Sequence, residues 1–400
     1  MGVMSRGLAR RFAAFYFLLF VPIGMQAPYL FLFFQRKGFS DAQLGTLAAV
    51  TPLMTVLSPP IWGAVADRFG DRRWTLGALL LAGGLVFPWL MWADSFAATL
   101  ILLVAFSWFA FPAGPITDAI ALENIERAGG EYGKLRLWGS LGFAAPLLAF
   151  GLVLSRRAGE TAASLYPIFV GYTAFRLISL GWVRLLPPSR GASGAGFDWR
   201  AARVFTSPRF LALAFCAVVA MGAMAAYYLY FSIYLDQRGV PDNMKGYFWA
   251  IAVASETAMM WAVGGLIRRI GLKWTFVLSV FGVALRLFAL SFPLGVVGIA
   301  GAQCLHSLTF TTFTVSGITF VNRIAPPHLR ASGQTLWVAL SQGAGSAVGA
   351  KLAGLAAASY GLLGMFRIFA LVAGIACLVA IALVRPADAP ERQPAPEVAG

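Results

Sequence analysis

Two acidic residues, Asp118 and Glu256, stand inside long apolar stretches of the chain. The other fourteen acids lie in loops, at the ends of such stretches or in the C-terminal tail. A carboxylate surrounded by hydrocarbon costs several kcal/mol unless it is paired, hydrated or protonated, so an acid in that position indicates a function. Burial also favours the neutral form of a carboxyl group, which makes both residues candidate proton carriers.

Spacing places Arg286 and His306 beside Glu256. Glu256 stands 15 residues before Gly271 and Arg286 stands 15 residues after it, so antiparallel helices that turn there would hold the pair at one depth. His306 follows Arg286 by 20 residues, across the next turn. We predict that Glu256 carries a proton and that His306 and Arg286 modulate its affinity. Because a guanidinium is always charged and forks onto a carboxylate, Arg286 would alternately neutralise Glu256 and bind an anionic substrate. The alternative is a fixed buried ion pair.

A second pair of charges, Asp118 and Arg136, is also expected at matched depth, because each residue is nine positions from Arg127. This pair would bind substrate, with Asp118 sharing in proton coupling, or it would be a static or gate-related ion pair. Uncharged side chains in the apolar stretches would complete a substrate cavity, although Tyr and Trp also gather at membrane interfaces. These cavity candidates are Gln26, Tyr29, Tyr227, Trp249 and Gln303.

The chain that carries these side chains is far more apolar than a soluble protein. Of its 400 residues, 59% are hydrophobic and 12% are charged, and the mean hydropathy is +0.76. Soluble domains carry about 25% charged residues. A nucleic-acid-binding protein with a net charge of +15 would cluster its basic residues on one face, but here they sit in short groups between apolar runs. The composition predicts an all-α, polytopic membrane protein with no nucleic-acid partner.

Apolar runs of about 20 residues suit helices that cross a bilayer core about 30 Å thick. By that measure we predict twelve spans. Their boundaries are 12–35, 41–66, 74–93, 99–122, 137–155, 164–186, 209–235, 246–267, 274–294, 296–321, 333–357 and 363–384.

The basic residues predict the orientation of these spans. If both ends of the chain are cytoplasmic, 21 of the 31 Lys and Arg residues lie on the cytoplasmic side and six lie on the other side. This asymmetry predicts cytoplasmic N- and C-termini for an integral protein of the cytoplasmic (inner) membrane. Lys351 and Arg367 fall within spans and are interpreted as interfacial anchors.

The chain repeats itself after 201 residues. Residues 63–73, between spans 2 and 3, read GAVADRFGDRR, and residues 264–274, between spans 8 and 9, read GGLIRRIGLKW. Two parallel six-helix repeats are typical of secondary transporters, whose substrate site lies between the halves near the midplane. We therefore predict four regions, which are the half 1–186, a cytoplasmic linker 187–208, the half 209–385 and a disordered tail 386–400.

Residues 63–73 match the pattern Gly-x-x-x-Asp-[Arg/Lys]-x-Gly-x-[Arg/Lys]-[Arg/Lys] at every defined position. This is the signature loop of the major facilitator superfamily, which the chain therefore resembles. The resemblance implies the major facilitator fold and a role for the loop in the cytoplasmic gate. The second copy has Arg268 where an acid would stand. The defined gate residues are Gly63, Asp67, Arg68, Gly70, Arg72 and Arg73.

A narrower resemblance comes from spans 4, 5, 9 and 10. Residues 132–143 (YGKLRLWGSLGF) are similar to a segment of the lactose permease and its relatives, the nucleoside:proton symporters and 3-phenylpropionate permeases. The resemblance implies that Arg136 and Asp118 match a substrate-binding arginine and carboxylate, and that Arg286 and His306 match an arginine on span 9 and a histidine on span 10. The family's Lys-x-x-His-x-x-Glu is here Gln303-x-x-His306-x-x-Thr309, so its lysine and its proton-carrying glutamate are missing. The segments APY at 27–29 and LHS at 305–307 are closest to phenylpropionate-permease-like members.

These observations predict a proton-coupled symporter that imports a small organic solute, with an aromatic carboxylate such as phenylpropionate as the preferred substrate class. The alternatives are a nucleoside or oligosaccharide proton symporter, a proton-coupled drug exporter and, last, a polytopic membrane enzyme. The sequence has no nucleotide-binding motif and no metal-ligand spacing. We expect no catalytic residue, no metal, no cofactor besides the proton gradient, and a monomer whose partners are the substrate and the lipid bilayer.

Overall fold

The computed structural model describes residues 5–128, 131–154, 161–189, 206–326 and 329–384, which form helices and turns with no strand among them. Most of the predicted linker and the predicted tail lie outside these described residues. The α-helices are α1 (Arg6–Gln26), α2 (Leu30–Arg36), α3 (Asp41–Arg68), α4 (Arg72–Val86), α5 (Phe96–Ala110), α6 (Ala113–Ala128), α7 (Tyr132–Ala149), α8 (Gly151–Leu154), α9 (Tyr166–Val183), α11 (Pro208–Gln237), α12 (Asp242–Leu290), α13 (Val296–Cys304), α14 (Phe313–Ile324), α15 (Arg330–Val338) and α16 (Ser346–Leu383).

Ten helical segments in the described part of the chain are long and apolar enough to cross a membrane. Two of them are far too long for one crossing, since the 49 residues of α12 would extend about 74 Å as a straight helix. Both segments are broken by a glycine with non-helical dihedral angles, Gly271 in α12 and Gly361 in α16. Ten segments are counted where twelve spans are predicted because each of these two contains two helices that meet at a glycine.

The internal repeat is visible in the backbone. Gly70 has a φ of 80° and Gly271, 201 positions later, has a φ of 81°. Gly38 and Gly239, separated by the same number of positions, have φ values of 91° and 70°. Glycine adopts such positive values without the steric penalty that a Cβ brings. The two pairs show that the turns on either side of the second span of each half, and not only the loop sequences, recur along the chain.

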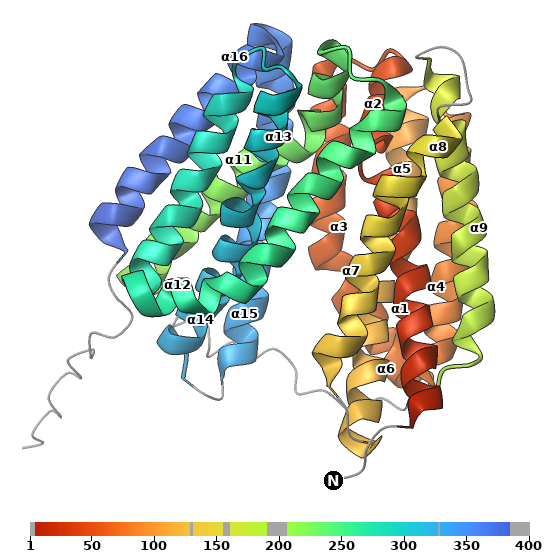
Figure 1. The fold of residues 1–400 in the computed structure, drawn as a ribbon. Coiled ribbons are helices and arrows are strands. Elements are labelled where there is room, and N and C mark those ends of the chain that lie inside the picture. Colours follow the sequence, from red (N-terminus) through yellow and green to blue (C-terminus); the bar gives the residue numbers. More distant parts are fainter. Residues whose placement is uncertain (1–4, 129–130, 155–160, 190–205, 327–328, 385–400) are drawn as a thin grey trace, which may run out of the picture.

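The helices form two groups that lie side by side, α1 to α9 and α11 to α16 (Figure 1). We name the end of the bundle that carries α2 the α2 end, and the end that carries the first residues of α1 and residues 63–73 the loop end. The ribbons of the two groups draw together at the α2 end and separate towards the loop end (Figure 1).

Glycines allow the two groups to touch at the α2 end. A Cβ added to Gly45 of α3 would lie 2.8 Å from the Gly354 Cα of α16, and one added to Gly246 of α12 would lie 2.2 Å from the Leu147 carbonyl oxygen of α7. Small residues let helix backbones approach this closely within membranes. The two groups therefore meet backbone to backbone at this end.

Candidate functional site

A fully buried arginine organises a polar layer inside the second group of helices. Arg286 of α12 donates from Nη2 to Gln303 Oε1 at 2.6 Å and from Nη1 to His306 Nδ1 at 2.7 Å. Tyr227 of α11 donates its hydroxyl to the same Gln303 oxygen at 2.9 Å, and its ring centroid lies 3.7 Å from Arg286 Cζ. A desolvated cation over an aromatic ring gains about 2 kcal/mol. Three helical segments thus converge on one guanidinium.

The contacts of His306 define where its proton lies. A guanidinium can only donate, so the Nδ1 atom that faces Arg286 must accept, and a neutral ring then carries its proton on Nε2. That Nε2 atom lies 3.6 Å from Glu256 Oε2, and the Glu256 side chain is 20% exposed. The carboxylate, the imidazole and the guanidinium therefore form a row with His306 in the middle.

The row corrects one expectation from the sequence. Glu256, Arg286 and His306 do lie in one layer, but Arg286 and Glu256 make no direct ion pair among the described contacts, because His306 lies between them. Counting residues from a turn predicts depth along a helix. It does not predict rotation about the helix axis, which decides which side chains touch.

An irregular stretch of helix shapes this layer. The helix α13 ends at Cys304, and residues Ser307–Thr312 form a π-helical stretch before α14 begins. Within it, Thr309 Oγ1 lies 3.4 Å from Arg286 Nη1, and the Thr311 hydroxyl donates to the Glu256 backbone carbonyl at 3.2 Å. Such π-stretches occur frequently at functional sites. The apolar pattern of the sequence predicts a regular span here and gives no sign of the irregularity.

Two donors in the layer have no acceptor within the described part of the chain. These are Arg286 Nε and Gln303 Nε2, both buried. A buried donor without a partner costs about 1–3 kcal/mol. The arrangement therefore suits a bound group that supplies acceptor oxygens, such as a carboxylate.

Aromatic side chains stand beside the polar layer. The Trp249 ring centroid lies 6.3 Å from that of Tyr228 in a stacked arrangement and 5.8 Å from that of Tyr227. The Trp249 Nε1 donates to the Ser232 hydroxyl at 3.0 Å, which holds the indole in place. Tyr227, Trp249 and Gln303, three of the predicted cavity residues, are thus found with Arg286.

The first group of helices holds the other predicted charges differently. Asp118 Oδ1 accepts a hydrogen bond from the Tyr16 hydroxyl at 2.6 Å, and the Arg136 guanidinium lies 4.2 Å from the Phe20 ring centroid. Among the described contacts the expected ion pair between Asp118 and Arg136 is not formed. The two residues share a depth, but their helices turn them towards α1 rather than towards each other. Gln26 Oε1 is buried, with no hydrogen-bond partner among the described residues.

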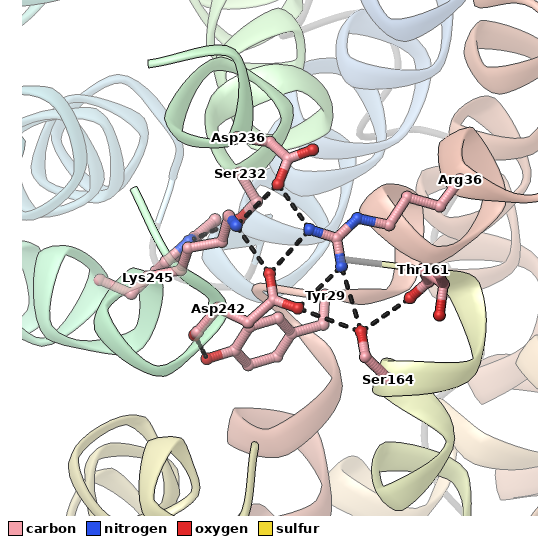
Figure 2. Close-up of polar contacts among 9 residues, drawn as sticks. Tyr29, Arg36, Thr161, Ser164, Ser232, Asp236, Asp242 and Lys245 are labelled. Carbon is pink, nitrogen blue, oxygen red and sulfur yellow. Dashed lines mark hydrogen bonds and ion pairs between the residues drawn. The ribbon is translucent and has the colours of Figure 1, made fainter. Parts of the chain in front are cut away.

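Tyr29 does not join the polar layer. It lies at the α2 end, where its hydroxyl donates to the Asp242 backbone carbonyl at 3.1 Å. Beside this contact lies a cluster of charges that the sequence reasoning missed (Figure 2).

The latch cluster consists of Arg36, Asp236, Asp242 and Lys245. Arg36 of α2 contacts Asp236 at 2.5 Å and Asp242 at 2.7 Å. Lys245 contacts the same two carboxylates at 2.8 and 2.7 Å. The Ser164 hydroxyl completes the arrangement by donating to Asp242 Oδ2 at 3.2 Å (Figure 2).

Hydropathy placed the latch cluster in loops, because its members flank apolar runs. A signal was nevertheless present in the sequence. Asp236 and Asp242 bracket a short turn between the seventh and eighth predicted spans, and Arg36 ends the first span at the same side of the membrane. Opposite charges at facing ends of repeat-related spans would have indicated a contact between the halves.

The signature loop contacts only its own group of helices within the described residues. Arg72 binds Asp67 at 2.8 Å and Glu123 at 3.5 Å, and its backbone N–H donates to the Ser189 carbonyl at 3.0 Å. Arg68 is exposed, and Gly70 adopts the left-handed turn while Gly63 lies within α3. The gate role of the loop stays a prediction.

A carboxylate in the same loop begins α4. The Asp71 carboxylate accepts from the Arg73 backbone N–H at 3.1 Å and binds the Arg73 guanidinium at 2.7 Å. Partial burial disfavours its charged form, but these hydrogen bonds and the guanidinium charge outweigh burial and hold the pKa of Asp71 below its usual range.

Comparison with known proteins shows what this chain is similar to. The model of the MFS_1 like family matches residues 9–368. The maltose permease of Geobacillus stearothermophilus is 28% identical over 341 residues, which cover 84% of each chain. The probable 3-phenylpropionic acid transporter of Escherichia coli (strain K12) is 25% identical over 362 residues, covering 90% of this chain and 93% of the relative. The crystal structure of the nucleoside transporter NupG superposes with a TM-score of 0.84 at 18% identity, covering 94% of this chain and 99% of that one.

Proposed function

The chain belongs to the MFS_1 like family of the major facilitator superfamily, and on that premise we propose that it is a proton-coupled symporter of a small organic carboxylate. The relatives are permeases and transporters, so the chain is an integral membrane transporter of small solutes and not an enzyme. The polar layer around Arg286 is the observation that carries the proposal of substrate and coupling.

The row Glu256, His306 and Arg286 suits coupling between a proton and an anion. While Glu256 is ionised, its charge partly offsets that of Arg286 through the intervening imidazole, and an anionic solute is held weakly. When Glu256 takes a proton, the net charge of the layer rises by one and the attraction for an anion increases. A guanidinium is suited to this part because it keeps its charge and binds carboxylate through two parallel hydrogen bonds.

The substrate class follows from the groups in and around the layer. Arg286 Nε and Gln303 Nε2, which have no acceptor in the described part of the chain, would bind the carboxylate oxygens. The rings of Tyr227, Tyr228 and Trp249 offer stacking surface for an aromatic body. The relative described as a probable 3-phenylpropionic acid transporter supports the same class. Phenylpropionate is therefore the first substrate to test.

We assign the loop end to the cytoplasm and the α2 end to the outside of the inner membrane. The support is the distribution of basic residues, of which 21 of 31 lie on the side that this orientation makes cytoplasmic. Import then begins at the α2 end, and the protein acts as a monomer without a cofactor other than the proton gradient.

Uptake into proteoliposomes tests the proposal. With an alkaline interior, the protein should accumulate radiolabelled 3-phenylpropionate, and a protonophore should abolish the accumulation. Glu256→Gln should lose accumulation while keeping substrate counterflow, which needs no net proton movement. The matched control is Asp94→Asn, which removes a carboxylate that is 90% exposed and lies outside the layer, and accumulation should persist.

Two results would overturn the proposal. Retained accumulation in Glu256→Gln, together with its loss in Asp118→Asn, would move the proton to the other carboxylate. Proton-driven uptake of uridine or maltose, with none of phenylpropionate, would replace the substrate class with a nucleoside or a sugar.

A further inference from the structure

We propose that the latch cluster has two basic residues with opposite effects, in which Arg36 holds the α2 end closed and Lys245 makes it easier to open. Three members belong to one group of helices, since Asp236 lies on α11 and Asp242 and Lys245 lie on α12. Arg36 alone comes from the other group, at the end of α2. The side chains are largely buried, with exposed fractions of 6% for Arg36, 20% for Asp236, 11% for Asp242 and 0% for Lys245.

In the closed arrangement the four charges balance. Arg36 lies between the two carboxylates and so does Lys245, and all four ionic contacts are 2.8 Å or shorter. Removing one partner from such a buried set leaves an uncompensated charge, which is strongly unfavourable. Arg36 is the only member that leaves when the groups part. Its loss of both carboxylates therefore opposes opening.

Lys245 acts in the opposite direction. It stays with Asp236 and Asp242 when Arg36 leaves, because all three residues sit on one helix–turn–helix and the Asp242–Lys245 contact is within one helical turn. The opened cluster then retains one net negative charge. Without Lys245, two adjacent carboxylates would face each other uncompensated, and their attraction for Arg36 would be stronger.

Other contacts place the seam between the groups at the same end. Tyr230 donates to Asp41 Oδ1 at 3.1 Å, and Lys351 donates to the Thr46 hydroxyl at 2.6 Å, each across the two groups. Lys351, interpreted from the sequence as an interfacial anchor, thus lies in the seam. Among contacts between described residues, the polar links between the groups all lie at the α2 end or within two helical turns of it. The latch cluster supplies the ionic ones.

The distance between the two groups at the α2 end is the direct test. Spin labels at Ala97→Cys on α5 and Val297→Cys on α13, both exposed positions near this end, would be placed in a variant without Cys216, Cys304 and Cys377. Double electron–electron resonance then reports the ratio of open to closed molecules. Arg36→Gln should raise this ratio, and Lys245→Met should lower it. The expected changes are about 5- to 150-fold, the range found for coupling between linked elements.

Two further variants keep the test decisive. Arg36→Lys keeps the positive charge but loses the two-pronged hydrogen bonding of the guanidinium, so the ratio of open to closed molecules should rise in part. Adding Lys245→Met to this variant should lower the ratio again. The double variant Asp236→Asn and Lys245→Met removes one negative and one positive charge, so Arg36 and Asp242 still balance. Its ratio of open to closed molecules should be near that of the parent protein. If Arg36→Gln and Lys245→Met shift the ratio in the same direction, or if neither shifts it, the proposal is wrong. The measurement uses no substrate, so its failure would leave the proposed function standing.

Discussion

Arg286 shows how much of the site depends on one side chain. Its two terminal nitrogens donate to Gln303 and His306, its plane lies on Tyr227, and its Nε has no hydrogen-bond partner among the described residues. The proposed binding of an anionic substrate depends on this guanidinium. A change that keeps its charge but alters its shape therefore separates electrostatic attraction from directed hydrogen bonding.

Arg286→Lys should raise the KM for substrate counterflow by about 10- to 100-fold, because hydrogen bonds to charged groups contribute about 1.5–3 kcal/mol. The maximal rate should change less, since the positive charge stays. Arg367→Lys is the matched control, because Arg367 is exposed and lies near Phe292, away from the layer. An unchanged KM in Arg286→Lys would show that this residue does not bind the substrate.

At the scale of elements, the glycine turns decide how the long helices fold back. Gly271 combines a φ of 81° with a ψ of 161°, a region that side chains other than hydrogen adopt only with strain. This turn lets the helix with Glu256 and the helix with Arg286 run antiparallel and brings both residues to one layer. Gly271 thus contacts no substrate in the proposed site, but the turn it forms determines the geometry of that site.

Gly271→Ala should destabilise the protein by about 1–3 kcal/mol, the usual cost of a strained backbone position. Gly264→Ala should instead stabilise the protein, because Gly264 lies within α12 and only the flexible end of Arg268 comes within 4 Å of an added Cβ. Alanine is favoured over glycine in a helix by about 1 kcal/mol. Thermal unfolding in detergent would compare the unfolding temperatures of the two variants. Equal shifts would contradict the conclusion that Gly271 holds a turn that requires glycine.

At the scale of the whole molecule, the two groups of helices have distinct ends, and the proposed orientation assigns each end to one side of the membrane. Ala97→Cys at the α2 end should react with a membrane-impermeant maleimide added to intact cells. Phe69→Cys at the loop end, where the native side chain is 74% exposed, should react only after the membrane is permeabilised. The reverse pattern would invert the topology and would make the latch cluster a cytoplasmic feature.

The sequence predicts the spans and the depth of residues along them better than it predicts which side chains touch. The apolar runs and the repeat can be read directly from the sequence, and the shared depth of Glu256, Arg286 and His306 follows from the fixed rise of a helix. The missing Asp118–Arg136 pair depends on rotation about helix axes, which residue counting does not contain. The latch cluster joins Arg36 to residues about 200 positions away, so no local pattern displays it.

The matching turns at Gly70 and Gly271 also bear on ancestry. Gly70 and Gly271, 201 positions apart, share a positive φ, whereas Asp67 is matched by Arg268 in the second copy. A duplicated gene whose two copies drift independently would show this pattern, because a change of charge at the surface is tolerated far more readily than a side chain at a positive φ. The two halves of this transporter therefore keep the path of the main chain at this turn more strictly than its charges, since Arg72 is matched by Lys273 while Asp67 is matched by Arg268.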